Sequence, residues 1–415
     1  MKAESEYGFE ESFMYVWAPA IVEYVEWVLA DAIASGKKKL YFLARDGWMM
    51  YHIAQKIIDR RALDIEARYL KVSRYAIRSA EYCLLGEESL ELICVGGIDI
   101  SFEKLMKRAL LTDEEARHIA ALSGYEEKYR TILNYRQIQD LKVKLKEIKQ
   151  LFIYIEQHSK LNYENTIGYL TQEGLLEDTP YALVDSGWIG TLQMSIQHLL
   201  SAGFGEERRI YGYYYGLYNV PKNVAKEQYK SFYFGQKSVW RKVYFSNCLF
   251  ETVLSSPDGM TVGYSHEGEK FVAIESANPN PNANELMQFK NLALIYADEY
   301  LRGECDQKRP CKALARLMSK PTQEEASLYG KMKFCDDIIE HTLQPLAAEW
   351  KTKDIKKQRF INKLLIKMNI RKQELHESAW PEGSITNHGG MVCWNLMQER
   401  MYKIFMYTRK AIVGK

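Results

Sequence analysis

The N-terminal part of the chain alternates between short apolar runs and segments with helical periodicity. Residues 12–36 form a mostly apolar helical pattern that ends at Gly36. The run KLYFL at 39–43 is apolar at consecutive positions, which is typical of a strand covered on both faces. A helical pattern at 48–61 and a strand-like segment at 67–74 follow. This succession of strand, helix and strand predicts a parallel βαβ unit.

The pattern becomes helical and more polar from about residue 75 to 178, and a strand-like segment returns at YALVD (181–185). A helical pattern closed by Gly203 and the strand-like RRIYGYYYGLY (208–218) come next. We therefore expect an α/β protein with a parallel sheet interrupted by a helical insertion. The expected parts are an α/β core at 1–74 and 179–277, a helical insertion at 75–178, a polar linker at 278–284 and a helical C-terminal domain at 285–415.

Composition excludes several classes of protein. The chain has 415 residues with a formal net charge of +2 from 56 basic and 54 acidic residues, so overall charge does not indicate a nucleic-acid partner. Its seven cysteines are scattered without a C-x-x-C pair, which argues against a disulfide framework and a structural zinc site. Neither a signal-peptide pattern nor an uninterrupted apolar run of about 18 residues is visible. We expect a cytoplasmic protein, soluble or peripheral to the membrane.

Two glycine-bearing loops follow predicted strands, where open parallel sheets bind ligands. In DSGWIGT (185–191), Gly187 and Gly190 allow backbone N–H groups to approach an anion, and Ser186 and Thr191 supply hydroxyls. The helix that starts near Thr191 adds its positive end. These features fit a phosphate site. An ordinary strand-to-helix turn with a Ser or Thr cap explains the same residues equally well.

The other loop, ARDG (44–47), combines a cation with a carboxylate. Arg45 and the free amides suit a diphosphate, and Asp46 suits Mg²⁺ or a hydroxyl. Asp185, at the tip of its strand, suits sugar hydroxyls or a metal held through water. Arg74, at the end of the second strand, could meet a phosphate. For both arginines, an ion pair at the sheet edge is the alternative.

Glu251 interrupts an otherwise apolar helical segment, NCLFETVL, that leads into the turn SSPDG with Ser255 and Ser256. An acid at such a position either faces solvent or serves a function.

The combination of these motifs carries a resemblance. The run YGF…WAPAIVEYVEWVLADAIASGKKKLYFLARDGWMMYHIAQKI…YLKVSR, followed by LVDSGWIGTLQ and FETVLSSPDGMTVGY, resembles a module of bacterial cell-surface polysaccharide proteins. This module often follows a haloacid-dehalogenase-type (HAD) phosphatase domain and is similar to type I phosphoribosyltransferases. The resemblance covers roughly residues 7–265. It implies a phosphoribosyltransferase-like, Rossmann-related sheet.

The resemblance also implies a function. Similar modules are glycosyltransferases that use phosphoribosyl diphosphate to add a 5-phosphoribofuranosyl group to a glycan or lipid-linked glycan acceptor in O-antigen or capsule synthesis. A separate HAD-type phosphatase then acts on the product. The resemblance assigns the sugar phosphate to DSGWIGT and the diphosphate to ARDG, with Mg²⁺ as cofactor.

The candidate site residues follow from the loops and the resemblance together. The catalytic candidates are Asp46 and Glu251, and the metal candidates are Asp46 and Asp185. The substrate-binding candidates are Ala44, Arg45, Gly47, Arg74, Asp185, Ser186, Gly187, Trp188, Gly190, Thr191, Ser255 and Ser256.

Two other functions remain open at this stage. One is a HAD-like phosphatase with Asp46 as nucleophile, although that chemistry needs a second acid two residues later and Trp48 occupies the position. The other is a non-catalytic module that binds a sugar phosphate or nucleotide and recruits a partner enzyme. Its support is the lone Asp185, because type I enzymes usually carry two adjacent acids. The basic, amphipathic segments 359–372 and 399–415 add an expectation of peripheral contact with the inner face of the membrane.

Overall fold

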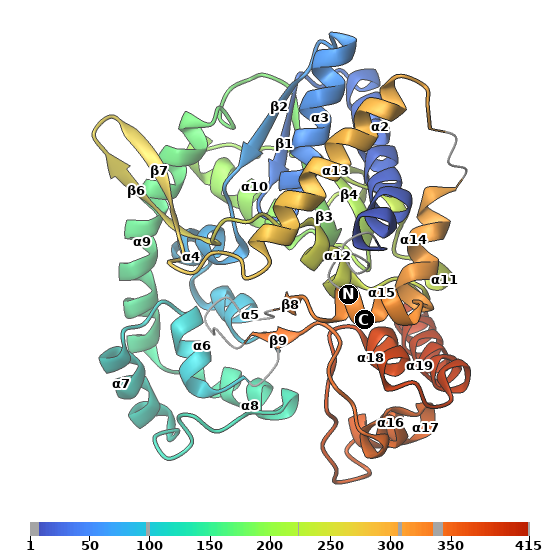
Figure 1. Cartoon of the computed structure of the whole chain (residues 1–415). Helices are drawn as coiled ribbons and strands as arrows, with labels where there is room; N and C mark the ends of the chain where they lie inside the picture. The colour runs from blue at the N-terminus through green and yellow to red at the C-terminus, as the bar shows by residue number, and fades with distance from the viewer. Residues whose placement is uncertain (1–7, 97–99, 223, 306–308, 335–342, 414–415) are drawn as a thin grey trace.

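Five strands form a parallel sheet that is covered by helices (Figure 1). A computed structural model describes residues 8–96, 100–222, 224–305, 309–334 and 343–413. The strand order is β2-β1-β3-β4-β5. The strands are β1 (Lys39–Leu43), β2 (Glu66–Leu70), β3 (Tyr181–Trp188), β4 (Gly212–Leu217) and β5 (Tyr229–Phe234). The predicted α/β class with a parallel sheet is therefore confirmed, and β5 is an additional edge strand.

Helices cover both faces of this sheet. On one face, Phe42 of β1 and Val184 of β3 belong to a core that includes α2 (Ala18–Ala34) and α3 (Gly47–Arg61). On the other face, Tyr41 and Leu183 pack with α4 (Arg74–Leu85), α9 (Lys149–Gln172) and α10 (Thr191–Phe204). This two-sided burial explains why KLYFL is apolar at every position after Lys39. The last helix ends at Gly205, which is left-handed with φ +75°, and not at the predicted Gly203.

The helical insertion has a core of its own. Between α4 and α9 lie η2 (Gly86–Ser89), α5 (Leu90–Ile93), α6 (Phe102–Arg108), α7 (Asp113–Ser123) and α8 (Tyr135–Lys146). Capping boxes start two of them: Thr112 with Glu115 at α7, and Asn134 with Gln137 at α8. Buried side chains from Tyr82 to Ile155 form a cluster separate from the sheet. Figure 1 shows α6, α7 and α8 away from the five-stranded sheet.

The segment after β5 combines two short helices with a hairpin that forms a sheet of its own. It contains α11 (Val239–Val243), α12 (Asn247–Leu254) and a hairpin of β6 (Thr261–Glu267) and β7 (Lys270–Glu275). The predicted linker at 278–284 is packed, because Asn280 and Asn282 are buried and hydrogen-bonded. Helix α13 (Ala283–Leu301) begins within the predicted linker and packs against α2 and α3 in the same core.

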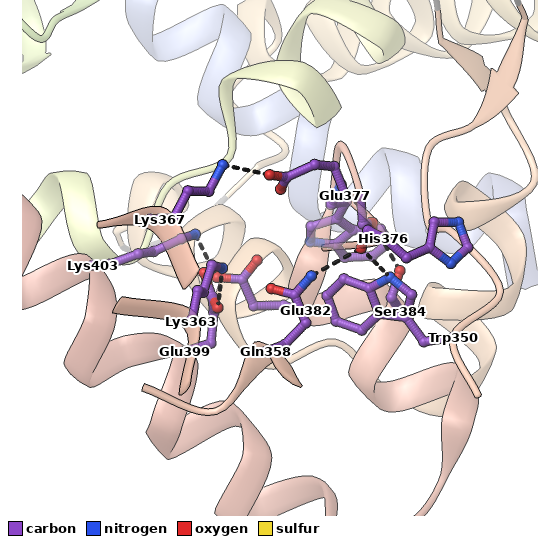
Figure 2. A network of polar contacts seen from close by, with 12 residues as sticks. Trp350, Gln358, Lys363, Lys367, His376, Glu377, Glu382, Ser384, Glu399 and Lys403 are labelled. Atoms are coloured by element: carbon purple, nitrogen blue, oxygen red, sulfur yellow. Dashed lines mark hydrogen bonds and ion pairs between the residues drawn. The ribbon is translucent and has the colours of Figure 1, made fainter. Parts of the chain in front are cut away.

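Buried ion pairs join three of the remaining C-terminal elements. The remaining elements are α14 (Pro310–Ser319), α15 (Gln323–Gly330), β8 (Lys333–Phe334), β9 (Gln344–Pro345), α16 (Thr352–Gln358), α17 (Phe360–Lys367), α18 (Pro381–His388) and α19 (Val392–Val413). Lys363 Nζ lies 2.7 Å from Glu399 Oε2, and Lys403 Nζ lies 2.5 Å from Glu382 Oε1 (Figure 2). These pairs join α17, α18 and α19 to one another.

The N-terminal helix is apolar enough to resemble a membrane span. The π-helical turn η1 (Phe13–Trp17) runs into α2, and the segment Gly8–Ala34 has the length and composition to cross a bilayer. Two thirds of its most apolar window is buried within the protein, where it packs against α3 and α13. Such burial is also typical of a core helix.

Candidate functional site

The two predicted glycine-bearing loops, 44–47 and 185–191, lie side by side at the carboxyl edge of the sheet. The second is shorter than predicted, because β3 continues to Trp188 and α10 begins at Thr191, which leaves only residues 189–190 between them. Strand β1 pairs with β2 on one side and β3 on the other, with Phe42 opposite Val184. The chain therefore builds the sheet outward in opposite directions from β1 and β3. Such a switch point opens a crevice outside the strand ends, where open α/β sheets bind ligands. The loops 44–47 and 185–191 border it.

A direct hydrogen bond joins these loops. Asp46 stands at the start of α3, but its side chain does not cap that helix. Instead, Asp46 Oδ2 accepts a hydrogen bond from the hydroxyl of Ser186, which is buried. The carboxylate of Asp185 accepts a second bond from the Ser186 backbone N–H, at 2.9 Å. Ser186 thus contacts both acids.

Helix α12 brings a third acid to the same place. Trp188 Nε1 donates to Glu251 Oε1 at 2.5 Å. The Trp188 ring lies among Phe245, Phe250 and Tyr218, with ring centroids 5.2–5.9 Å away. Glu251 is therefore held in an aromatic environment by Trp188, the last residue of β3.

Burial and mutual repulsion raise the pKa of all three acids. Burial, followed by repulsion from Asp46, raises the pKa of Asp185 to about 8 and that of Glu251 to about 7. The pKa of Asp46 is also raised, chiefly by burial, against the Ser186 hydrogen bond and the positive charges of Arg45 and Arg74. A group of acids with displaced pKa values can hold or move a proton near neutral pH.

The loop 185–191 approaches neighbouring backbone and rings closely enough to require glycine. Gly187 has φ +135°, and a Cβ there would lie 1.9 Å from the Gly216 carbonyl oxygen. Gly190 has φ +76°, and its Cβ would lie 2.7 Å from the Tyr229 ring. Gly190 is also the N-cap of α10, so no side chain caps this helix. The expected alternative, a Ser or Thr cap, is wrong, and the first N–H groups of α10 are left for another acceptor.

Arg78 is a site residue that the sequence analysis missed. It lies on α4, and its Nη2 donates to Thr191 Oγ1 at 3.1 Å, at the start of α10. Its Nε is buried and has no hydrogen-bond partner among the described residues, and burial lowers the pKa of its guanidinium. Arg78 is one helical turn after Arg74, which is a spacing that places both on one face. That spacing is the signal that could have found it.

The structure also places four residues that were predicted to bind substrate: Ala44, Arg45, Gly47 and Arg74. Arg74 is the exposed first residue of α4, after the capping Ser73. The peptide bonds Ala44–Arg45 and Gly187–Trp188 are cis. A Cβ on Gly47 would lie 2.9 Å from the carbonyl carbon of Phe42.

Ser255 and Ser256 are buried and already have protein partners. Asn280 Nδ2 donates to Ser255 Oγ at 3.2 Å and to the Ser256 carbonyl oxygen at 3.0 Å. The Ser256 hydroxyl accepts from the backbone N–H of Asp258 at 3.2 Å. These bonds stabilise the turn that follows α12, and α12 is the helix that carries Glu251.

The acids are compatible with Mg²⁺ only if other ligands take part. Across the described ranges, no group of three or more His, Cys, Asp or Glu side chains is arranged to hold a metal by itself. Mg²⁺ commonly uses one or two carboxylates and completes its shell with substrate phosphates and water. Asp46 and Asp185, which repel each other electrostatically, fit that requirement.

Comparison of the sequence with family models finds no match, and comparison with curated proteins finds no significant relative.

Proposed function

We propose that this chain is a glycosyltransferase that moves a 5-phosphoribofuranosyl group from phosphoribosyl diphosphate to a glycan acceptor in surface-polysaccharide synthesis. The observation that carries the proposal is the joined pair of loops at the switch point, where Ser186 bonds to Asp46 beside Glu251. Three acids with raised pKa values and three arginines meet there. This is a charge distribution suited to a ligand with anionic groups at both ends.

The proposed donor lies across both loops. Its sugar phosphate is bound by the uncapped start of α10 and by Arg78, whose Nε has no other partner among the residues described. Its diphosphate is bound by Arg45 and Arg74, the cations that act on Asp46. Asp46 and Asp185 would hold Mg²⁺, which when bound neutralises charge on the leaving diphosphate.

Glu251 is the proposed general base. The bond from the anomeric carbon to diphosphate breaks with its electron pair leaving on the diphosphate, and a bond to the acceptor oxygen forms. The acceptor's proton passes to Glu251. A carboxylate with a pKa of about 7 is suited to accept a proton near neutral pH. Asp46, the other catalytic candidate, already accepts a hydrogen bond from Ser186 and is better placed to position the donor.

A non-catalytic binding module is the second candidate function. Its specific support is Asp185, because a pKa of about 8 leaves this lone acid largely protonated at neutral pH. A neutral carboxyl group is a weak metal ligand and a good hydrogen-bond partner for a sugar hydroxyl.

Diphosphate release distinguishes the two functions. The purified chain is incubated with phosphoribosyl diphosphate, Mg²⁺ and a panel of free and lipid-linked glycans. Acceptor-dependent release supports the transferase, and we expect Glu251→Gln to lower its rate about 100-fold or more. The control Glu269→Gln, on an exposed hairpin turn, should leave it unchanged. Tight binding without release supports the binding module, and neither binding nor release refutes both.

A further inference from the structure

A large cavity lies on the β5 side of the molecule and shares no residue with the candidate site. Its volume is about 750 Å³, and we call it the α14 cavity. Figure 1 places α11, α14 and α19 on the same side of the molecule. Helix α14 and the residues that flank it contribute seven of the thirteen lining residues, and α2, β5, the α11 region and α19 contribute the others.

The charges around the α14 cavity are strongly unbalanced. Its cations are Arg241, Arg309, Lys312, Arg316, Lys320 and Arg400, and its one carboxylate is Glu23. Glu325 pairs with Arg316 through both carboxylate oxygens. For the other five cations, no carboxylate of the described chain lies within 4.0 Å. Among the described residues, positive charges around the cavity therefore outnumber negative ones, and five of its cations have no carboxylate partner.

Two of the guanidinium groups lie over aromatic rings, and a hydrogen bond also fixes one of them. Arg241 donates to the Tyr233 carbonyl oxygen at 2.5 Å and lies 5.4 Å from the centre of the Tyr233 ring. Arg400 lies 5.1 Å from the centre of the Tyr244 ring. Held guanidinium groups bind phosphate oxygens in pairs, and the nearby rings offer flat apolar faces.

We propose that the α14 cavity binds an organic diphosphate, with its phosphates on Arg241, Lys312 and Arg400 and its organic part against the tyrosine rings. The volume is within the roughly 300–1,000 Å³ of pockets that enclose an organic ligand, whereas a lone phosphate would leave most of it empty. A soluble nucleoside or sugar diphosphate and a lipid diphosphate headgroup share this chemistry. The inference does not depend on the proposed transferase.

Binding of ADP and of a prenyl diphosphate tests the cavity and separates the two sources. Titration calorimetry compares ADP with inorganic phosphate, and flotation compares phosphatidylcholine vesicles with and without a prenyl diphosphate. We expect the double variant Lys312→Glu, Lys320→Glu to weaken binding of the preferred probe at least tenfold, because both lysines are exposed and line the cavity. The control Lys146→Glu reverses an exposed lysine at the end of α8, outside the cavity, and should have no effect.

Ligand binding to the α14 cavity can be distinguished from ligand binding at the candidate site. Arg45→Ala should leave binding to the α14 cavity intact, whereas it should impair the proposed donor site. Binding of ADP points to a soluble ligand, and binding restricted to prenyl diphosphate vesicles points to a lipid. Inorganic phosphate bound as tightly as ADP would remove the organic part of the proposal. No binding of any probe, or equal binding by the double variant, overturns it.

Discussion

The Ser186 hydroxyl donates a hydrogen bond to the Asp46 carboxylate, and this contact joins the end of β3 to the turn between β1 and α3. The two residues are 140 positions apart in the chain. Each loop taken alone is compatible with an ordinary strand-to-helix turn. Their contact at the switch point of the sheet gives the pair a common role, because one ligand at that edge would meet both.

The Ser186–Asp46 bond can be tested by removing its donor. Ser186→Ala leaves a largely desolvated carboxylate without its side-chain partner, so we expect a loss of about 1–2 kcal/mol in the free energy of unfolding at pH 7. Urea unfolding measures it. Ser265→Ala is the matched control, since that hydroxyl lies 3.4 Å from Glu267 at an exposed hairpin. Equal losses in the two variants would contradict a specific role for Ser186.

Asp185 predicts a pH dependence of stability with a definite sign. Its pKa is about 8 in the folded protein and near 4 when unfolded, so the folded state binds more protons between these values. Stability contributed by this group therefore falls as pH rises from about 4 to 8. Asp185→Asn removes the ionisation, and we expect the variant to match the wild type near pH 4 and to exceed it by roughly 2–4 kcal/mol at pH 9.

Chemical unfolding across this pH range measures the Asp185 effect. The control is Asp64→Asn, because Asp64 is almost fully exposed and pairs with Lys38 at the surface. Its difference from the wild type should stay small at every pH. A constant difference between Asp185→Asn and the wild type from pH 4 to 9 would show that Asp185 ionises normally.

Trp188 predicts a shift in the pH profile of the proposed reaction. Its indole N–H bonds to the Glu251 carboxylate and so lowers the pKa of Glu251, partly offsetting burial. Trp188→Phe removes that donor while keeping an aromatic ring. The pKa of Glu251 should rise, so the acid limb of kcat/KM, expected near pH 7, should move to higher pH by about one unit.

Rates of acceptor-dependent diphosphate release give this profile. Glu251→Gln should remove the acid limb altogether at a much lower rate. If Trp188→Phe lowers the rate equally at all pH values, the tryptophan acts by packing and Glu251 is not the base.

Gly187 predicts a severe effect of a single methyl group. Gly187→Ala would place a Cβ against the Gly216 carbonyl oxygen at a φ that L-residues rarely adopt, so we expect a loss of about 4 kcal/mol or failure to fold. Gly263→Ala is the control, because nothing lies within 4 Å of its added Cβ. Thermal unfolding of both variants measures the difference, and similar melting temperatures would refute the close approach.

The sequence predicted the sheet where residues were apolar on consecutive positions. Strand β1 is an example, because both of its faces are buried. Strand β5 was missed because it is an edge strand whose segment YKSFYF mixes polar and aromatic residues. Arg78 was missed because only the packing of α4 beside α10 brings it to Thr191. The α14 cavity was missed because five separate segments line it. Contacts of that kind depend on topology, which local periodicity does not encode.

The C-terminal helices predict contact with an anionic membrane. Trp394, Met397, Met401 and Phe405 are each 38–45% exposed and recur along one face of α19. Residues 351–415 contain 14 lysines and arginines against five acids, a net charge of +9 in a chain whose total is +2. An exposed apolar stripe in so basic a region matches an interfacial helix on anionic lipid.

We expect the chain to float with vesicles containing phosphatidylserine and not with neutral ones. Replacing Trp394 and Phe405 by serine should reduce binding several-fold, whereas Leu161→Ser, an exposed leucine on α9, should not. Equal recovery with anionic and neutral vesicles, or none with either, would refute the membrane contact.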